Sequence, residues 1–170
     1  MILKATISIV GFGLAITAPL TLQSPVWTVS LRAAGPVRFG ITIDDARKLL
    51  ADSLPGAGLV GCDLVKPQSA PAGLDLMVEE GRVVRVDIRD STVPTKSGAR
   101  VGDTEERVRS LYGARIRTEA HKYTNGHYLI FVPADPADSA YRLIFETDGK
   151  RVVKIRAGLR PQVEYVEGCS

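Results

Sequence analysis

The sequence has few of the residues that most metal sites and nucleophilic enzymes need. It contains two His, two Cys and one Trp in 170 residues, and the His and Cys do not stand at zinc-ligand spacing. It also lacks the H-E-x-x-H, G-x-S-x-G, Walker-type and G-x-G-x-x-G motifs. We therefore expect a protein that is not an enzyme and has no cofactor or metal. A pair of carboxylates facing one cleft would be the remaining route to a small hydrolase.

Blocks of like charge are absent as well. The net charge is only +3, and acidic and basic residues alternate along the chain. A nucleic-acid-binding protein would more often cluster Lys and Arg on one element. We expect a globular protein whose partner is another protein, not a nucleic acid.

A long apolar run occurs only near the start. Residues 5–20, "ATISIVGFGLAITAPL", follow a short basic segment that ends at Lys4. The run is shorter than the roughly 20 apolar residues of a membrane span, and the pattern predicts a signal peptide within residues 1–30. Its cleavage site stays open between Ala18, Thr28 and Ser30, and an uncleaved N-terminal anchor is the alternative. We expect a periplasmic or secreted protein without a membrane span in its mature form.

The two cysteines, Cys62 and Cys169, lie far apart and not in a C-x-x-C pair. In an exported chain this arrangement predicts one disulfide. A catalytic thiol would need a His and an acid beside it, and we consider that reading much weaker.

One phrase occurs twice, as "GITIDDARKLL" at 40–50 and "GDTEERVRSLY" at 102–112. In each copy a Thr is placed to cap a helix, with acidic residues in the first turn. Apolar residues then follow at helical spacing and predict one buried stripe per helix. The expected stripes are Ala46, Leu49, Leu50 and Val108, Leu111, Tyr112.

The similarity continues into the segments that follow the two phrases. "LDLMVEEGRVVRVDI" at 74–88 resembles "LIFETDGKRVVKIRA" at 143–157, and each predicts two strands joined by a Gly turn. The sequence therefore predicts an α+β fold of two tandem helix-plus-β-meander repeats, at 36–90 and 91–170, with the helices packed on one face of an antiparallel sheet. Strands are expected near 60–66, 73–79, 82–88, 115–122, 127–132, 140–146, 151–157 and 162–166.

The repeated G-x-T-x-x-[DE]-x-[AV] phrase, followed by a meander, resembles the repeat of the beta-lactamase inhibitor protein and of the small outer-membrane assembly lipoprotein. Both families are exported, bacterial and non-enzymatic, and the tandem arrangement is closer to the inhibitor. The resemblance implies an architecture and a class of function. It implies no contact residues, because this chain has one helix and one cysteine per predicted repeat.

The second predicted repeat differs from the first mainly by a longer hairpin around "TNG" at 124–126. Hairpin tips often carry recognition, so we expect the partner-binding residues here. They are Tyr123, Asn125, His127 and Tyr128. An ordinary exposed hairpin is the plainer reading, and a metal site between His121 and His127 lacks an apparent third ligand.

We expect an inhibitor of a secreted or periplasmic hydrolase. The alternative is an accessory protein of envelope assembly, against which the missing lipid-attachment cysteine counts. A minor alternative is a lysozyme inhibitor, because "SGAR" at 97–100 resembles the S-G-x-x-Y loop of C-type lysozyme inhibitors. Val101 stands where that loop has Tyr, and a basic chain is a poor match for a basic lysozyme.

Overall fold

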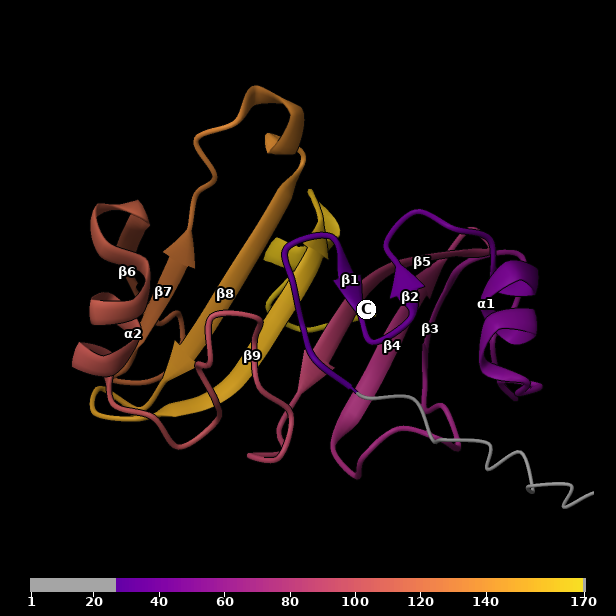
Figure 1. The fold of residues 1–170 in the computed structure, drawn as a ribbon, viewed down its shortest axis with the longest axis horizontal. Helices are drawn as coiled ribbons and strands as arrows, with labels where there is room; N and C mark the ends of the chain where they lie inside the picture. The colour runs from indigo at the N-terminus through magenta and orange to yellow at the C-terminus, as the bar shows by residue number, and fades with distance from the viewer. Residues whose placement is uncertain (1–26, 170) are drawn as a thin grey trace, which may run out of the picture.

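One antiparallel sheet of seven strands organises the computed structural model, which describes residues 27–169 (Figure 1). A two-stranded ribbon, two α-helices and three short 3-10 helices surround it. In order across the sheet the strands are β3 (Cys62–Val65), β4 (Leu74–Glu79), β5 (Arg82–Ile88), β9 (Val152–Leu159), β8 (Tyr141–Thr147), β7 (His127–Phe131) and β6 (Ile116–Ala120). The other elements are β1 (Ala33–Ala34), β2 (Val37–Arg38), α1 (Ile43–Leu50), α2 (Glu105–Tyr112), η1 (Gly113–Arg115), η2 (Pro136–Asp138) and η3 (Gln162–Glu164).

The predicted fold class is wrong. The described chain is mostly β, and its two α-helices have only eight residues each. It does not form two helix-plus-meander repeats, because β5 pairs directly with β9 and joins all the long strands into a single sheet. Each helix phrase forms only about two turns, so the helices are a small part of the fold and do not determine its class.

The positions of individual strands were predicted more accurately. Seven of the expected strands overlap β3 to β9. The eighth, at 162–166, is wrong, because this segment begins with the 3-10 helix η3. Both predicted helix caps are confirmed: the side chain of Thr42 accepts a hydrogen bond from the Asp45 amide, and that of Thr104 accepts one from the Arg107 amide.

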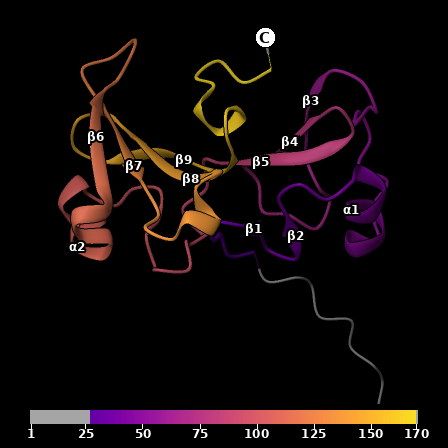
Figure 2. The same ribbon diagram turned by 90° about the horizontal axis from the view of Figure 1, so that it is seen from above.

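The larger core lies on the face of the sheet that carries α1, α2 and the β1–β2 ribbon (Figure 2). Helix α1 contributes Ile43, Ala46 and Leu50, whereas Leu49 is 56% exposed. The predicted stripe is therefore wrong at Leu49, and Ile43 packs in the core in its place. Leu111 and Tyr112 of α2 pack partly buried against the same core.

The segment before the ribbon also belongs to this core. Trp27 and Val29 are buried, and the Trp27 indole donates to the Ser69 carbonyl at 2.8 Å. A signal peptide that ended at Thr28 or Ser30 would remove the Trp27 side chain from this core, and the cleavage site stays a prediction. Residues 1–26 of the predicted signal peptide lie outside the described residues.

The predicted disulfide is confirmed. Cys62 at the start of the edge strand β3 is bonded to Cys169, and the two cysteines are 107 positions apart. No helix within residues 27–169 has the length and apolar character needed to cross a membrane.

Candidate functional site

The β6–β7 loop, residues 121–126, which we call the tip, does not present the four predicted contact residues together. Tyr123 and Asn125 are exposed in the tip, and Tyr123 is 57% exposed. Side chains alternate along β7, so His127 and Tyr128 point to opposite faces of the sheet. His127 meets α2, and Tyr128 is buried on the other face. Of the predicted set, Tyr123 and Asn125 are exposed in the tip, the His127 side chain is 40% exposed beside α2, and only Tyr128 is buried.

His121 gives the tip its shape. Its Nδ1 accepts hydrogen bonds from the backbone amides of Tyr123 (3.0 Å) and Thr124 (3.2 Å). Because Nδ1 is an acceptor, Nε2 carries the proton and donates to Glu146 at 3.1 Å. The imidazole also stacks on the Tyr128 ring, with centroids 4.6 Å apart. The tip is therefore held as a defined loop.

Gly126 completes the tip through a close backbone approach. A Cβ at this position would lie 1.9 Å from the carbonyl oxygen of Thr147 on β8. Glycine is the residue that lets the two segments meet here. The "TNG" pattern predicts a turn, but it predicts neither this contact nor the role of His121.

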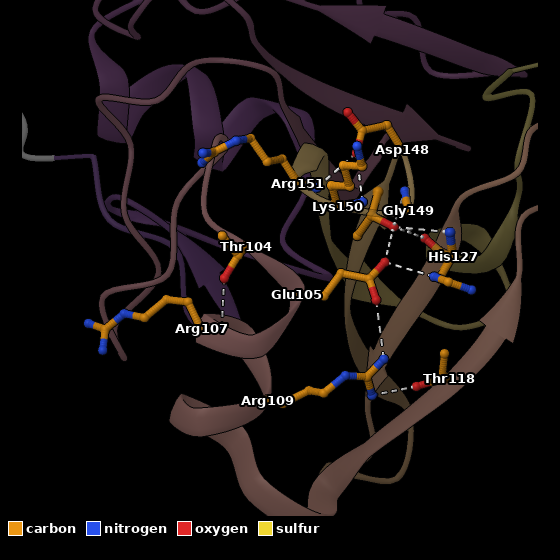
Figure 3. A network of polar contacts seen from close by, with 11 residues as sticks. Thr104, Glu105, Arg107, Arg109, Thr118, His127, Asp148, Gly149, Lys150 and Arg151 are labelled. Carbon is orange, nitrogen blue, oxygen red and sulfur yellow. Dashed lines mark hydrogen bonds and ion pairs between the residues drawn. The ribbon is translucent and has the colours of Figure 1, made fainter.

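On the face of the sheet that carries α1 and α2, which we call the helix face, the buried carboxylate of Glu105 holds the start of α2 against the sheet (Figure 3). Oε1 of Glu105 accepts from Thr147 Oγ1 at 2.6 Å and from His127 Nδ1 at 2.8 Å. Oε2 accepts from Arg109 at 3.3 Å, and Arg109 also donates to Thr118 of β6 at 2.7 Å. Both carboxylate oxygens are thus engaged in holding α2 against β6, β7 and β8.

The same contacts decide the charge of Glu105. Burial by itself would raise the pKa of the carboxyl, but the hydrogen bonds from Thr147 and His127 outweigh it, and the pKa lies below the ordinary value. Glu105 is therefore ionised at neutral pH. We assign the Glu105–His127 pair to positioning of α2, and His127 does not belong to the exposed tip.

His121 and His127 do not converge on a metal site. They lie on opposite faces of the sheet, and each is bonded to its own glutamate. Within the part of the chain that the structure describes, no three His, Cys, Asp or Glu side chains are grouped to hold a metal ion.

The other face of the sheet, which we call the tail face, receives the C-terminal residues 161–169, which we call the tail (Figure 2). Arg85 of β5 is 1% exposed and binds Asp87 through two hydrogen bonds of 2.7 Å. Its remaining donors reach the tail carbonyls of Gln162 (2.9 Å) and Tyr165 (2.7 Å). Arg156 of β9 donates to the same Tyr165 carbonyl at 2.6 Å. Buried arginines thus fix the path of the tail.

The buried Arg85 side chain depends on a glycine in the neighbouring strand and on a buried acidic partner. Gly158 stands opposite Arg85 in the strand register, and a Cβ there would lie 2.3 Å from the Val84 carbonyl oxygen. Asp87 also accepts from Lys154 at 3.0 Å. Burial would raise the pKa of Asp87, but its bonds to Arg85 outweigh burial, and the pKa is lowered.

The tail and the tip meet at the surface. Glu167 accepts a hydrogen bond from the Tyr123 hydroxyl and lies 3.6 Å from Lys122 Nζ. The Lys122 ammonium lies 4.9 Å from the centre of the Tyr123 ring, in a cation–π contact. Tyr165 is 38% exposed and lines a small hollow with Lys122 and Glu167. We call Lys122, Tyr123, Asn125, Tyr165 and Glu167 the tip–tail surface.

The alternative loop at 97–100 lies elsewhere, on the helix face. Lys96 and Ser97 stand at the rim of a hollow of about 410 Å³ whose walls include Leu31, Tyr112 and Phe131. Arg100 donates to the carbonyls of Ser91 and Thr92, both at 3.1 Å, so its guanidinium holds the loop itself. The lysozyme-inhibitor reading of this loop stays a prediction.

Comparison with known proteins gives one slight likeness. No family model and no curated protein matches the sequence. A solved structure that resembles it is that of a DUF4309 family protein (YjgB) from Bacillus subtilis subsp. subtilis str. 168. The identity is 15% and the TM-score 0.45, over 76% of this chain and 85% of that chain. A likeness of this size carries no argument about family or function.

Proposed function

We propose that the protein is an exported, non-enzymatic binding protein that recognises another protein through the tip–tail surface. The observation that carries the proposal is that two exposed tyrosines, Tyr123 and Tyr165, each lie beside the Lys122–Glu167 contact. Tyrosine gives a large contact area and a polar end at low entropic cost, and it is enriched at the centres of protein interfaces.

The surface rests on a rigid base, which favours recognition. His121 and Gly126 define the tip from within, and Arg85 and the Cys62–Cys169 disulfide define the tail. A preorganised surface loses less conformational freedom on binding than a mobile loop does. His127 and Tyr128 contribute to the proposed function indirectly, by fixing the two faces of β7.

The disulfide supports the exported location, because such bonds persist in oxidising compartments. Inhibition of a secreted or periplasmic hydrolase is the version of the function that we propose. This version is motivated by the resemblance of the repeated phrase to the beta-lactamase inhibitor protein, and not by the fold, which lacks the tandem-repeat architecture that the resemblance implies.

Capture of a partner tests this proposal. The oxidised, full-length protein should be immobilised and exposed to envelope extract and to culture medium, and the retained proteins identified by mass spectrometry. We expect a soluble hydrolase whose activity falls when the protein is added back. Recovery of an outer-membrane complex would instead support the envelope-assembly alternative, and turnover by the protein itself in a glycosidase and esterase panel would contradict the non-enzymatic assignment.

Variants then locate the contact. Tyr123→Ala and Tyr165→Ala should each weaken binding of the captured partner by about fivefold or more, as expected for interface tyrosines. Leu49→Ala is the matched control, because Leu49 is 56% exposed, against 57% for Tyr123, and lies on α1. Full affinity in the Tyr123→Ala, Tyr165→Ala double variant would exclude the tip–tail surface and leave the loop at 97–100 as the next candidate.

A further inference from the structure

A separate hollow lies on the tail face, bounded by β6, β7, β8, β9 and the tail. Its volume is about 280 Å³, small for a ligand pocket. Apolar side chains form part of the wall and arginines form another part. The apolar residues are Ile130, Ile144 and Val166, and the arginines are Arg117, Arg156 and Arg160.

Arg156 is the unusual member of this wall. It is 1% exposed, and within residues 27–169 no carboxylate lies within 4.0 Å of it. One donor reaches the Tyr165 carbonyl, but the buried Nε has no partner among the described residues. Tyr128 also lines the hollow, and its hydroxyl is buried against the Lys122 backbone.

A buried guanidinium with no carboxylate in direct contact carries a large desolvation cost. Burial, followed by the like charge of Arg85, lowers the pKa of Arg156, and the more distant charges of Glu146 and Asp87 offset only part of this shift. Its ring contact with Tyr128, 5.4 Å from guanidinium carbon to ring centre, offsets only part of that cost. An anion beside Arg156 would therefore stabilise this face of the protein.

The surroundings also have an excess of positive charge. Glu119 pairs with Arg117 at 2.9 Å, and Glu164 pairs with Arg160 at 2.7 Å, so both acidic residues of the wall are occupied. Arg142 of β8 adds a further cation whose buried Nε lacks a partner in the described chain. Burial, and then the charge of nearby Arg160, lowers the pKa of Arg142.

We propose that this hollow binds the carboxylate of a small ligand that carries a short apolar chain. A guanidinium presents paired donors that match the two oxygens of a carboxylate. Arg156 would receive the carboxylate at the base of the hollow, with Arg160 and Arg117 at its rim. Ile130, Ile144 and Val166 would cover the apolar chain, which favours an amphiphilic monoanion over a fully hydrated anion such as phosphate.

Titration of the full-length protein with hexanoate tests the proposal, with hexan-1-ol and inorganic phosphate as comparison ligands. The readout is the NMR signal of the arginine Nε–H groups at neutral pH. We expect a saturable shift of the Arg156 signal with hexanoate, and binding at least about tenfold weaker for the other two ligands, because each lacks one half of the recognised chemistry. The absence of a saturable shift, as for a hollow that holds only water, would overturn the proposal. Equal binding of phosphate would contradict the proposed recognition of an apolar chain.

Two variants and one control complete the test. Arg156→Gln should weaken hexanoate binding at least about tenfold, since it removes a charged donor. Arg160→Glu changes an exposed rim position and tests the site even if Arg156→Gln fails to fold. It should weaken hexanoate binding about fivefold or more. Arg107→Glu is the control, because it makes the same charge change at an exposed position on α2. Equal losses in Arg160→Glu and Arg107→Glu would mean that only the net charge matters, and would contradict the site.

Discussion

Replacing Asp87 with Asn should destabilise the protein far more than the same replacement at Asp75. Asp87 is 1% exposed and receives two hydrogen bonds of 2.7 Å from Arg85 and one of 3.0 Å from Lys154. The substitution keeps the shape and removes the charge, which leaves Arg85 and Lys154 without their counter-ion. Breaking a buried ion pair on one side costs about 3–5 kcal/mol.

Asp75 provides a control in the same register. It stands directly opposite Asp87 on the neighbouring strand β4, and it pairs at 2.7 Å with Arg89, whose side chain is 48% exposed. An ion pair of this kind contributes about 0–1 kcal/mol. The measurement is urea unfolding of both variants, in which a lower midpoint at an unchanged slope reports lost stability.

The pH dependence of the Asp87 variant adds an independent check. The folded-state pKa of Asp87 lies below its unfolded value, so its stabilising contribution is present at neutral pH and is lost as the pH falls through the folded-state pKa. Asp87→Asn should therefore lose less stability on acidification than the parent protein does. Equal unfolding midpoints for Asp87→Asn and Asp75→Asn would refute the inference that the buried pair organises the tail face.

Further predictions concern the disulfide, the helix stripe and the acid sensitivity of α2. Cys62→Ala should cost about 4–5 kcal/mol in the chain-entropy description for a separation of 107 residues, measured by urea unfolding of oxidised parent and variant. Leu111→Ala should cost about 2 kcal/mol of stability, because Leu111 packs partly buried on the core. Leu49→Ala should cost less than about 0.5 kcal/mol, because Leu49 is exposed. Equal losses would contradict the assigned helix faces. Glu105→Gln should reduce the stability lost on acidification below about pH 4.5, because the contribution of Glu105 is present at neutral pH and is lost as the pH falls through its lowered folded-state pKa. An unchanged acid profile would contradict its ionised role.

The sequence was informative where local patterns decide the structure. Alternation and Gly turns placed seven strands, and the Thr caps placed both helices. The fold class required long-range information that these patterns do not contain. The pairing of β5 with β9 turned two similar segments into one sheet, and the segment that begins at Trp27 filled part of the core.

The tail face could not be predicted, for a related reason. In "RVVRVDI" the alternation of Arg85 and Asp87 with apolar residues is the ordinary pattern of a strand with one solvated face. Only the return of the tail over this face buries both side chains. The sequence pattern did place Tyr123 and Asn125 in the exposed tip. The pattern did not distinguish these exposed residues from the buried Tyr128. Strand alternation shows on which face of the sheet a side chain lies, but not whether other residues cover that face.

The tail connects parts of the sheet that are distant in sequence. Glu167 meets the β6–β7 loop, while Cys169 is bonded to β3 at the other edge of the sheet. Between these points Arg85 and Arg156 hold the Gln162 and Tyr165 carbonyls. Each anchor limits the freedom of the others, because a short segment fixed at both ends has few alternative paths. The buried arginines, which contribute nothing to the exposed surface, therefore determine where Tyr165 and Glu167 stand relative to Tyr123.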